Sequence, residues 1–413
     1  MYPGLGDKPG GRDMDIRMSD QRRIDAVQAV SDGRLEKKRG SEVLGVTVRQ
    51  VNRLLVKLRE AGISGLIHGN RGLISHRKIP DQIREKILAL VRGRYIDIND
   101  THLMEILMRE ESIKIGRETL RSLLRTNGTG PKRKRRSRKF RSRRERKEAF
   151  GCMLQIDASR HDWLEGRGPI LTLVGGKDDA TGYVWARFEY AETSWAYLHL
   201  IQDIASTHGL PMSLYSDRHG IFHVPREPTI VEQFQQTAPL TQFGRAMQDL
   251  GIQLIKAWSA PAKGRIERHW GFSQDRLVVE LRLAGATTIE DANRGLAVFL
   301  KDHNRRFTVP PKHRDPLFRK PPHMHQMNHI LCLKEIRTVN NDNTISFEGI
   351  ILQIPHVKGL RSLAKRKVDV LQLRDGSIEI QYDTRTVARF CKEAVTRLIA
   401  QNRKENSQLK NVA

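Results

Sequence analysis

The sequence predicts a multidomain protein: all-α helix-turn-helix units at the amino terminus, a central α/β domain with a mixed sheet, and a small carboxyl-terminal β-barrel. Three observations predict this. Apolar residues recur at helical spacing up to about residue 128, strands and helices alternate from residue 151, and a hairpin pattern follows residue 325. At 413 residues, the chain is also longer than one ordinary domain.

The net charge indicates the kind of partner. Lys and Arg number 73 against 47 Asp and Glu, giving +26 at pH 7, and such an excess attracts a polyanion such as nucleic acid. A membrane surface is the alternative, but no stretch approaches 18 apolar residues and the start lacks a signal-peptide layout. We therefore expect a cytoplasmic, nucleoid-associated protein without a membrane partner. Three widely spaced cysteines exclude a disulfide framework.

Segment 18–75, after an expected disordered tail over 1–17, has the pattern of a helix-turn-helix domain. Gly45 interrupts the helical period, and Thr47 with Gln50 forms a capping-box pattern that opens the next helix. The apolar face of that helix consists of Val51, Leu54, Leu55 and Leu58. The opposite face carries the candidate DNA contacts Arg49, Asn52, Arg53 and Lys57. A three-helix bundle with solvated charges is the alternative, and the net charge favours DNA binding.

A second helical unit is predicted over 76–128, where three apolar stripes end at Asn127-Gly128. Arg117 and Arg121 lie on a polar face and are further candidate DNA contacts. The helix-turn-helix pattern is weaker than in the first unit, so a purely structural bundle stays open as the alternative.

A basic linker follows over 129–150, without any apolar period. The candidate DNA contacts at its start are Lys132, Arg133, Lys134, Arg135 and Arg136. Each such charge can displace counterions from the DNA backbone, which gives strong, salt-sensitive binding without sequence preference. A nuclear-import signal is the other interpretation of a run like this.

Residues 151–310 have the pattern of one α/β domain. The expected strands are Met153–Ile156, Ile170–Val174, Tyr183–Phe188, Pro211–Tyr215 and Ile252–Ala257. The expected helices are Ser194–Thr207, Thr241–Leu250 and a long helix after Pro261. Three strands, a helix, a strand, a helix, a strand and a helix is the order of an RNase H-like fold with a mixed sheet.

Three carboxylates in this domain are candidate catalytic and metal-binding residues. Asp157 lies on the first strand, Asp217 ends the fourth, and Glu267 lies in the first turns of the long helix. If the first and fourth strands are neighbours, the two aspartates converge and the helix supplies the glutamate. Carboxylate oxygens suit Mg²⁺ or Mn²⁺, and two such ions can drive phosphodiester chemistry. Taken singly, each acid is more often a helix cap or a solvated charge, so the assignment depends on the sequence motifs around the three acids.

Those strings resemble the three catalytic motifs of insertion-sequence DDE transposases, which have an integrase-like core. They are Gln155-Ile-Asp157-Ala-Ser, Tyr215-Ser-Asp217-Arg-His and Lys263-Gly-Arg-Ile-Glu267-Arg-His-Trp270. The layout from about Met18 onward is most similar to ISNCY-type transposases. Lys263 and Arg268, which flank the glutamate, are candidate DNA contacts.

The resemblance implies hydrolysis at transposon ends that depends on two Mg²⁺ or Mn²⁺ ions, followed by attack of the freed 3′-hydroxyl on target DNA. It implies double-stranded DNA partners, namely terminal repeats and target, and a homodimer or larger assembly on paired ends. Two features depart from related integrases. No His-His-Cys-Cys zinc module is present, and the stretch 223–240 is longer than in compact cores, either as a surface loop or as a DNA-contacting insertion.

The carboxyl-terminal third has a different pattern. Strand-like alternation flanks Asp375-Gly376, and Thr344–Ile354 alternates with Gly349 as an expected bulge. These features predict a small β-barrel over 325–395 and a polar tail over 396–413.

Two other function classes compete with a transposase. One is a DNA-binding regulator with a catalytically silent core, which the presence of all three acids disfavours. The other is a tyrosine-type recombinase, for which none of the seven tyrosines has a convincing setting. A polymerase or ligase would need a nucleotide-binding loop, and no G-x-x-x-x-G-K-[ST] string occurs.

Overall fold

The computed structural model describes residues 18–67, 78–132, 145–227, 229–234, 239–257, 264–359 and 361–410. Arg133 to Arg136 and Lys263, which the sequence predicts as DNA contacts, lie outside these ranges. The chain divides into two compact units, Met1–Ala89 and Leu90–Ala413, and each is described by itself.

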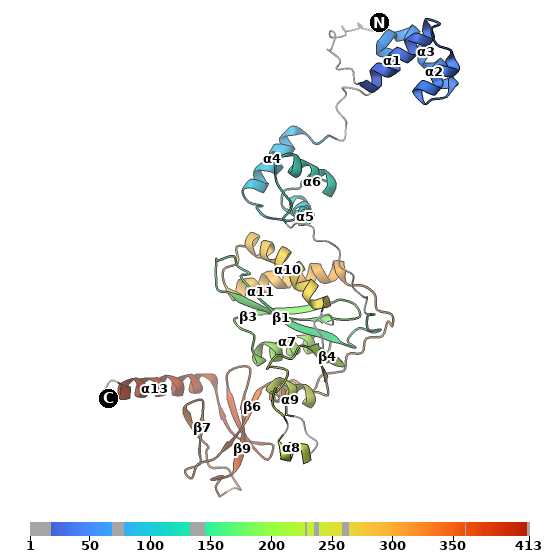
Figure 1. The fold of residues 1–413 in the computed structure, drawn as a ribbon. Helices are drawn as coiled ribbons and strands as arrows, with labels where there is room; N and C mark the ends of the chain where they lie inside the picture. The colour runs from blue at the N-terminus through green and yellow to red at the C-terminus, as the bar shows by residue number, and fades with distance from the viewer. Residues whose placement is uncertain are drawn as a thin grey trace, which may run out of the picture. The chain divides into compact units, whose positions relative to one another are not determined.

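The first unit is a small helical bundle (Figure 1). Its elements are α1 (Met18–Ser31), α2 (Lys37–Leu44), α3 (Val48–Ala61) and the 3₁₀ turn η1 (Gly62–Leu66). Ile24, Val27, Val51 and Leu55 are buried between them. The predicted capping box opens α3, because the Gln50 backbone N–H donates to the Thr47 hydroxyl and the Gln50 side chain accepts from the Thr47 N–H at 3.0 Å.

Three further helices follow: α4 (Asp81–Arg92), which crosses the boundary between the units, α5 (Asp100–Glu110) and α6 (Arg117–Thr126). Apolar side chains of α5 and α6 pack together, as the predicted stripes require; they include Leu103, Ile106, Leu120 and Leu124, all buried.

The central sheet of the second unit has the strand order β3-β2-β1-β4-β5. The strands are β1 (Leu154–His161), β2 (Leu171–Asp178), β3 (Val184–Glu189), β4 (Ser213–Ser216) and β5 (Gln253–Lys256). β2 is antiparallel to both β1 and β3, whereas β4 is parallel to both β1 and β5. The sheet is therefore mixed, as predicted, and β1 and β4 are neighbours.

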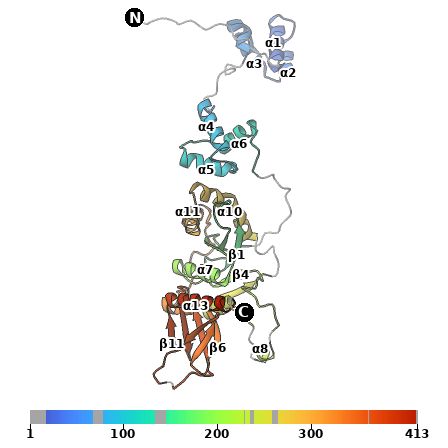
Figure 2. The ribbon, with the colours of Figure 1, turned by 90° about the vertical axis from the view of Figure 1, so that its left-hand side faces the viewer.

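Helices cover both faces of this sheet (Figure 1, Figure 2). They are α7 (Ser194–Thr207) and α9 (Gln242–Asp249) on one face, and α10 (Gly264–Leu283) and α11 (Ile289–Phe307) on the other. A short helix, α8 (Ile230–Phe234), follows β4. Strand alternation explains the two cores: Ile156 packs with α7 and α9, whereas Leu173 packs with α10 and α11.

Helix α5 docks on α10 and α11 through charged side chains. Glu105 receives hydrogen bonds from Arg276 at 2.6 Å and from Arg306 at 2.7 Å. Glu280 of α10 accepts from Arg109 at 2.9 Å and pairs with His102 at 2.7 Å. Each carboxylate thus has two partners, an arrangement that holds charge-assisted hydrogen bonds in fixed geometry.

The carboxyl-terminal region contains two sheets. Its elements are α12 (Met324–Ile330), β6 (Leu333–Thr338), β7 (Thr344–Phe347), β8 (Ile350–Gln353), β9 (Lys367–Gln372), β10 (Ile378–Tyr382), β11 (Arg385–Phe390) and α13 (Lys392–Lys410). The sheets are β11-β10-β9-β6 and β7-β8, with a shared apolar core. Strand pairing among the described residues does not close a barrel, so the predicted β-barrel is not confirmed.

Two turns in this region can be compared with the sequence. Gly376 has a φ of 81° in the predicted Asp-Gly turn between β9 and β10. Glu348 and Gly349, with φ of 48° and 79°, form the turn between β7 and β8, so the expected bulge at Gly349 is a hairpin turn instead. The segment predicted as a polar tail continues as α13 up to Lys410.

Candidate active site and an adjacent basic pocket

Asp157 lies on β1, and Asp217 directly follows the last residue of the neighbouring strand β4. Gln155 pairs with Tyr215 across the parallel strands β1 and β4, an offset of 215 − 155 = 60 residues, and 157 + 60 = 217. Continued by two residues, this register would bring Asp217 level with Asp157, whose carboxylate faces α10. The first and fourth strands are thus neighbours, and the meeting of the two aspartates stays a prediction.

Tyr197 of α7 is buried in the core on the other face of the sheet from α10. Burial raises the pKa of this phenol well above its usual value, and the charge of Glu192 raises it further. The charges of Asp157 and Asp217 act in the same direction.

Helix α10 runs along β1 and fixes the orientation of Asp157. The Ile266 backbone N–H donates to the Gln155 side chain at 3.3 Å, the Trp270 indole N–H donates to Asp157 Oδ2 at 3.0 Å, and Gln274 donates to the Ser159 hydroxyl at 3.2 Å. Four residues of a helix rise about 6 Å and two residues of a strand about 6.6 Å, so these contacts stay in step.

Gly175 makes this close approach possible. It pairs with Asp157 across β1 and β2, directly beneath the Trp270 ring. A Cβ at this position would lie 2.7 Å from the Trp270 ring and 2.9 Å from the Trp185 carbonyl oxygen. Glycine therefore leaves the space that the indole fills.

Glu267 lies in the first turn of α10 and is exposed. Residues advance by about 100° around a helix, so Glu267 lies on one flank of α10 while Arg265, Arg268 and His269 lie on the other. The second flank borders a pocket formed with β2, so Glu267 is on the flank toward β4 and Asp217. Nevertheless, no group of three or more His, Cys, Asp or Glu side chains among the described residues is arranged to hold a metal ion. The described residues therefore show the two aspartates at neighbouring strands and no assembled three-carboxylate group.

Buried polar residues hold the first turn of α10 to the end of β2. Gln155 and Asp179 are both buried, and the Gln155 amide donates to Asp179 Oδ1 at 2.9 Å. Arg265 forms an ion pair with the same carboxylate at 2.5 Å. Asp178 is buried next to it and accepts from Gly151 N–H at 3.0 Å and Thr181 N–H at 2.7 Å. Burial raises the pKa of Asp178 despite these hydrogen bonds.

Gln155, Asp178 and Asp179 are not among the candidate site residues that the sequence predicts. The sequence contains one signal that could have found this network: Gln155 shares an interior strand with Asp157, where a polar side chain needs a partner. Its partners lie 24 and 111 residues away along the chain, which the local pattern does not indicate.

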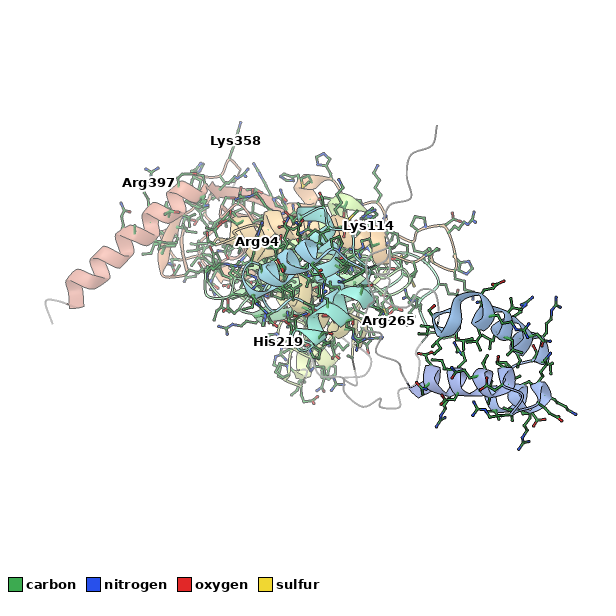
Figure 3. All side chains as sticks on the ribbon, turned by 90° about the horizontal axis from the view of Figure 1, so that it is seen from above. Arg94, Lys114, His219, Arg265, Lys358 and Arg397 are labelled. Atoms are coloured by element: carbon green, nitrogen blue, oxygen red, sulfur yellow. The ribbon has the colours of Figure 1, made fainter. Side chains whose placement is uncertain are left out.

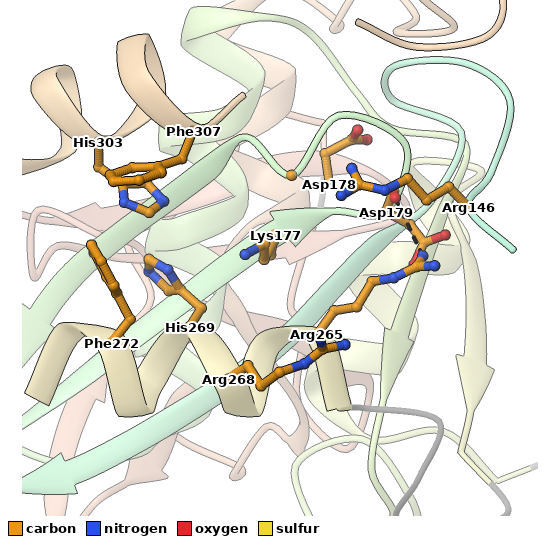
Figure 4. Close-up of a pocket in the computed structure, with 11 residues that line it drawn as sticks. Arg146, Lys177, Asp178, Asp179, Arg265, Arg268, His269, Phe272, His303 and Phe307 are labelled. Carbon is orange, nitrogen blue, oxygen red and sulfur yellow. Dashed lines mark hydrogen bonds and ion pairs between the residues drawn. The ribbon is translucent and has the colours of Figure 1, made fainter. Parts of the chain in front are cut away.

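A basic pocket of about 290 Å³ lies on the far flank of α10 from Glu267 (Figure 4). Helix α10 contributes Arg265, Arg268, His269 and Phe272; α11 contributes His303 and Phe307; β2 and the following turn contribute Lys177, Asp178, Asp179 and Gly182; Arg146 precedes β1. In Figure 4 the Lys177 ammonium lies between the α10 side chains and Asp178.

The other predicted DNA contacts are distributed over the helical elements. Arg49, Asn52, Arg53 and Lys57 are all exposed on α3. On α6, Arg117 and Arg121 lie 2.8 Å and 3.7 Å from Glu118. Lys132 is largely covered and pairs with Asp275 of α10 at 3.3 Å, and exposed Arg268 donates to the Gly264 carbonyl at 2.8 Å.

Exposed basic side chains also occur elsewhere on the second unit; they include Arg94, Lys114, Lys358 and Arg397 (Figure 3). In the part of the chain that the structure describes, no helix is both long and apolar enough to span a membrane.

Comparison with known proteins identifies relatives over most of the chain. The transposase y4bF of Sinorhizobium fredii is 35% identical over 366 residues, which cover 88% of this chain and 79% of that protein. The transposase for insertion sequence IS1202 of Streptococcus pneumoniae is 30% identical over 402 residues, which cover 87% of this chain and 84% of that protein. No protein-family model matches the sequence.

The similar solved structures are retroviral proteins, and their TM-scores are low. The simian T-cell lymphotropic virus intasome in complex with PP2A regulatory subunit B56γ has 15% identity and a TM-score of 0.32 over 75% of this chain and 97% of that chain. The catalytic core of HTLV-2 integrase in complex with magnesium has 16% identity and a TM-score of 0.27 over 36% and 84%. The sequence relatives alone decide the assignment: the chain belongs to the insertion-sequence transposases.

Proposed function

We propose that this transposase binds transposon ends and cuts and rejoins DNA at a divalent-metal site formed by Asp157, Asp217 and Glu267. The observation that supports the proposal is the parallel pairing of β1, which carries Asp157, with β4, which Asp217 follows, beside the first turn of α10, which carries Glu267. The reaction would be hydrolysis at the transposon end, followed by attack of the freed 3′-hydroxyl on target DNA.

The donor chemistry of these side chains suits Mg²⁺ or Mn²⁺, since all three offer carboxylate oxygens. Two bound ions would activate the attacking oxygen and stabilise the departing one. The protein itself holds Asp157 through the Trp270 indole and Asp217 through the His219 backbone N–H at 3.0 Å. Glu267 would complete the ligand set from the exposed turn of α10.

DNA recognition would be divided among several elements. We propose that the exposed basic face of α3 reads the transposon end as the second helix of a helix-turn-helix unit, within the predicted domain 18–75. The predicted domain 76–128, with Arg117 and Arg121, and the basic linker 129–150 would contact the backbone. The core 151–310, the sheets within 325–395 and the segment 396–413 complete the proposed domains, and paired ends would require a homodimer or larger assembly.

A DNA-binding regulator with a silent core is the second candidate. One observation favours it: among the residues that the structure describes, Glu267 does not join the aspartates in a metal-binding cluster. Such a protein would bind transposon ends tightly and leave them uncut.

End cleavage with labelled duplexes in Mg²⁺ or Mn²⁺ tests the proposal. We expect nicking at a defined position that Asp157→Asn, Asp217→Asn and Glu267→Gln each abolish, while end binding stays near wild type. Glu290→Gln on α11 removes an exposed carboxylate elsewhere in the same domain and should leave cleavage intact. Tight binding of a verified end without cleavage would support the silent regulator instead.

A further inference from the structure

The basic pocket beside α10 carries a surplus of positive charge. Four cationic side chains line it against two carboxylates, so 4 − 2 leaves +2. One carboxylate, that of Asp179, is paired with Arg265. The other, Asp178, is occupied by hydrogen bonds from Gly151 and Thr181. Neither carboxylate is therefore free to balance the remaining cations.

Lys177 is the least compensated of these cations. It projects from β2 beneath α10 and α11, on the same face as Gln155, and it is half-buried. Among the described residues, its ammonium has no ion-pair or hydrogen-bond partner. Burial lowers its pKa to about 8, and the neighbouring arginines act in the same direction. A covered cation repelled by its neighbours is stabilised when an anion enters.

The histidines of the pocket offer further polar atoms. His269 Nδ1 and both ring nitrogens of His303 are buried and have no hydrogen-bond partner within the described part of the chain. Burial and the nearby Lys177 lower the pKa of His303 to about 4, so its ring is neutral near pH 7 and carries one N–H. Unsatisfied buried polar atoms are uncommon in folded proteins, and a bound ligand can satisfy them.

We propose that this pocket binds a phosphate group of the DNA backbone, with Lys177 as its central contact and Arg146 and Arg268 beside it. This inference rests on the proposed function, because it takes DNA as the ligand. The pocket and Glu267 lie on opposite flanks of the first turn of α10, which is about 10 Å across with its side chains. A DNA strand that crosses the first turn of α10 would be held by the pocket on one flank and presented to the carboxylates on the other.

Acylation of lysine amines provides a direct test. At pH 8, an amine with a lowered pKa is partly uncharged and reacts readily, whereas a phosphate against it raises the pKa and covers the nitrogen. The full-length protein would be acetylated in EDTA, which prevents cleavage, and modification at each lysine would be read by mass spectrometry. The arms are protein alone, protein with inorganic phosphate, and protein with a transposon-end duplex.

We expect the duplex to reduce modification of Lys177 at least several-fold, with inorganic phosphate effective only at far higher concentration. Lys301, exposed on α11, is the internal reference and should change little. Protection by inorganic phosphate but not by the duplex would overturn the DNA assignment in favour of a free anion. Equal modification of Lys177 in all three arms would overturn the phosphate site itself.

A variant pair provides a second measurement. Lys177→Met keeps the stem of the side chain and removes the charge, so we expect the slope of log affinity against log salt to become shallower by about 0.9, the effect of one phosphate contact. Lys301→Met should leave the slope unchanged, and a Lys177→Met slope equal to wild type would contradict the inference. Lys177→Met should melt no lower than wild type without DNA, since it removes an uncompensated charge.

These outcomes separate the pocket from the catalytic proposal. If the carboxylate variants abolish cleavage while Lys177 stays unprotected, only the pocket inference fails. If wild type never cleaves but Lys177 is protected by the duplex, the catalytic proposal fails and the pocket stands.

Discussion

Replacing Trp270 with phenylalanine tests whether α10 prepares Asp157 for catalysis. The variant removes the indole N–H, which donates to Asp157 Oδ2 at 3.0 Å, and keeps an aromatic ring there without the far edge of the indole that lies over Gly175. A hydrogen bond to a charged group contributes about 1.5–3 kcal/mol, which corresponds to roughly 10- to 150-fold in a rate or metal affinity. Asp157 is only partly buried, so we expect a loss near the lower end, about 10-fold.

Single-turnover cleavage of end duplexes across a Mg²⁺ titration measures this effect. We expect either a higher Mg²⁺ concentration at half-maximal rate or a lower maximal rate, because the carboxylate is no longer held in one orientation. The smaller ring also leaves a gap that costs about 1 kcal/mol of stability, which a thermal melt would register separately.

Trp163→Phe is the matched control. Trp163 is buried in the same domain, but its indole donates to the Ser159 backbone carbonyl at 3.2 Å and not to a catalytic candidate. It should lower the melting temperature without changing the metal dependence. A folded Trp270→Phe enzyme with wild-type cleavage and an unchanged Mg²⁺ midpoint would refute the orienting role of the indole.

Three further predictions concern docking, recognition and packing. Burial alone would raise the pKa of Glu105, but hydrogen bonds from two arginines lower this pKa to about 2. The folding stability linked to this shift is present above about pH 4.5 and is lost as the pH falls toward 2. Glu105→Gln should therefore speed hydrogen exchange of α5 at pH 7, for a cost of about 1–2 kcal/mol after allowance for solvent screening; unchanged exchange would exclude this docking role. Neutralising Arg49 and Arg53 together should weaken binding to end DNA more than to random DNA in competition assays, and equal losses would remove α3 as the reading helix. Gly175→Ala should lower both the melting temperature and the rate of cleavage, because the added Cβ meets Trp270. Gly271→Ala is the control: it has open space around it and should raise stability by about 0.5–1 kcal/mol. A Gly175→Ala variant with wild-type stability and cleavage would contradict the close packing.

Local sequence signals predicted much of the architecture because their physical causes are local. The capping box at Thr47 and Gln50 and the Asp-Gly turn at Gly376 depend on a few neighbouring residues, and both are confirmed. The order of strands and helices in the core follows from apolar periodicity. The pairing of β1 with β4 then follows from the sheet topology, and the meeting of Asp157 with Asp217 stays a prediction.

The features that escaped prediction depend on contacts between distant segments. β2 continues through Gly175 and Gly176 to Asp178, beyond its predicted end at Val174, because the paired strands on both sides supply hydrogen bonds that glycine propensity does not indicate. That extension places Lys177 in the pocket beneath α10. The predicted barrel is not confirmed among the described residues, since barrel closure depends on which strand edges pair and not on the alternation within each strand.

The docking of α5 onto α10 and α11 has a consequence for engineering chimeric transposases. Glu105 and Glu280 lie on opposite sides of this junction, and each is neutralised by cations from the other side. A helical segment transplanted from another transposase would bring its own charges, and a single mismatch would leave a partly covered charge without its partner. Exchange of α5 should therefore succeed only when the matching positions on α10 and α11 are exchanged with it, so the natural unit for recombining these proteins includes both sides of the junction.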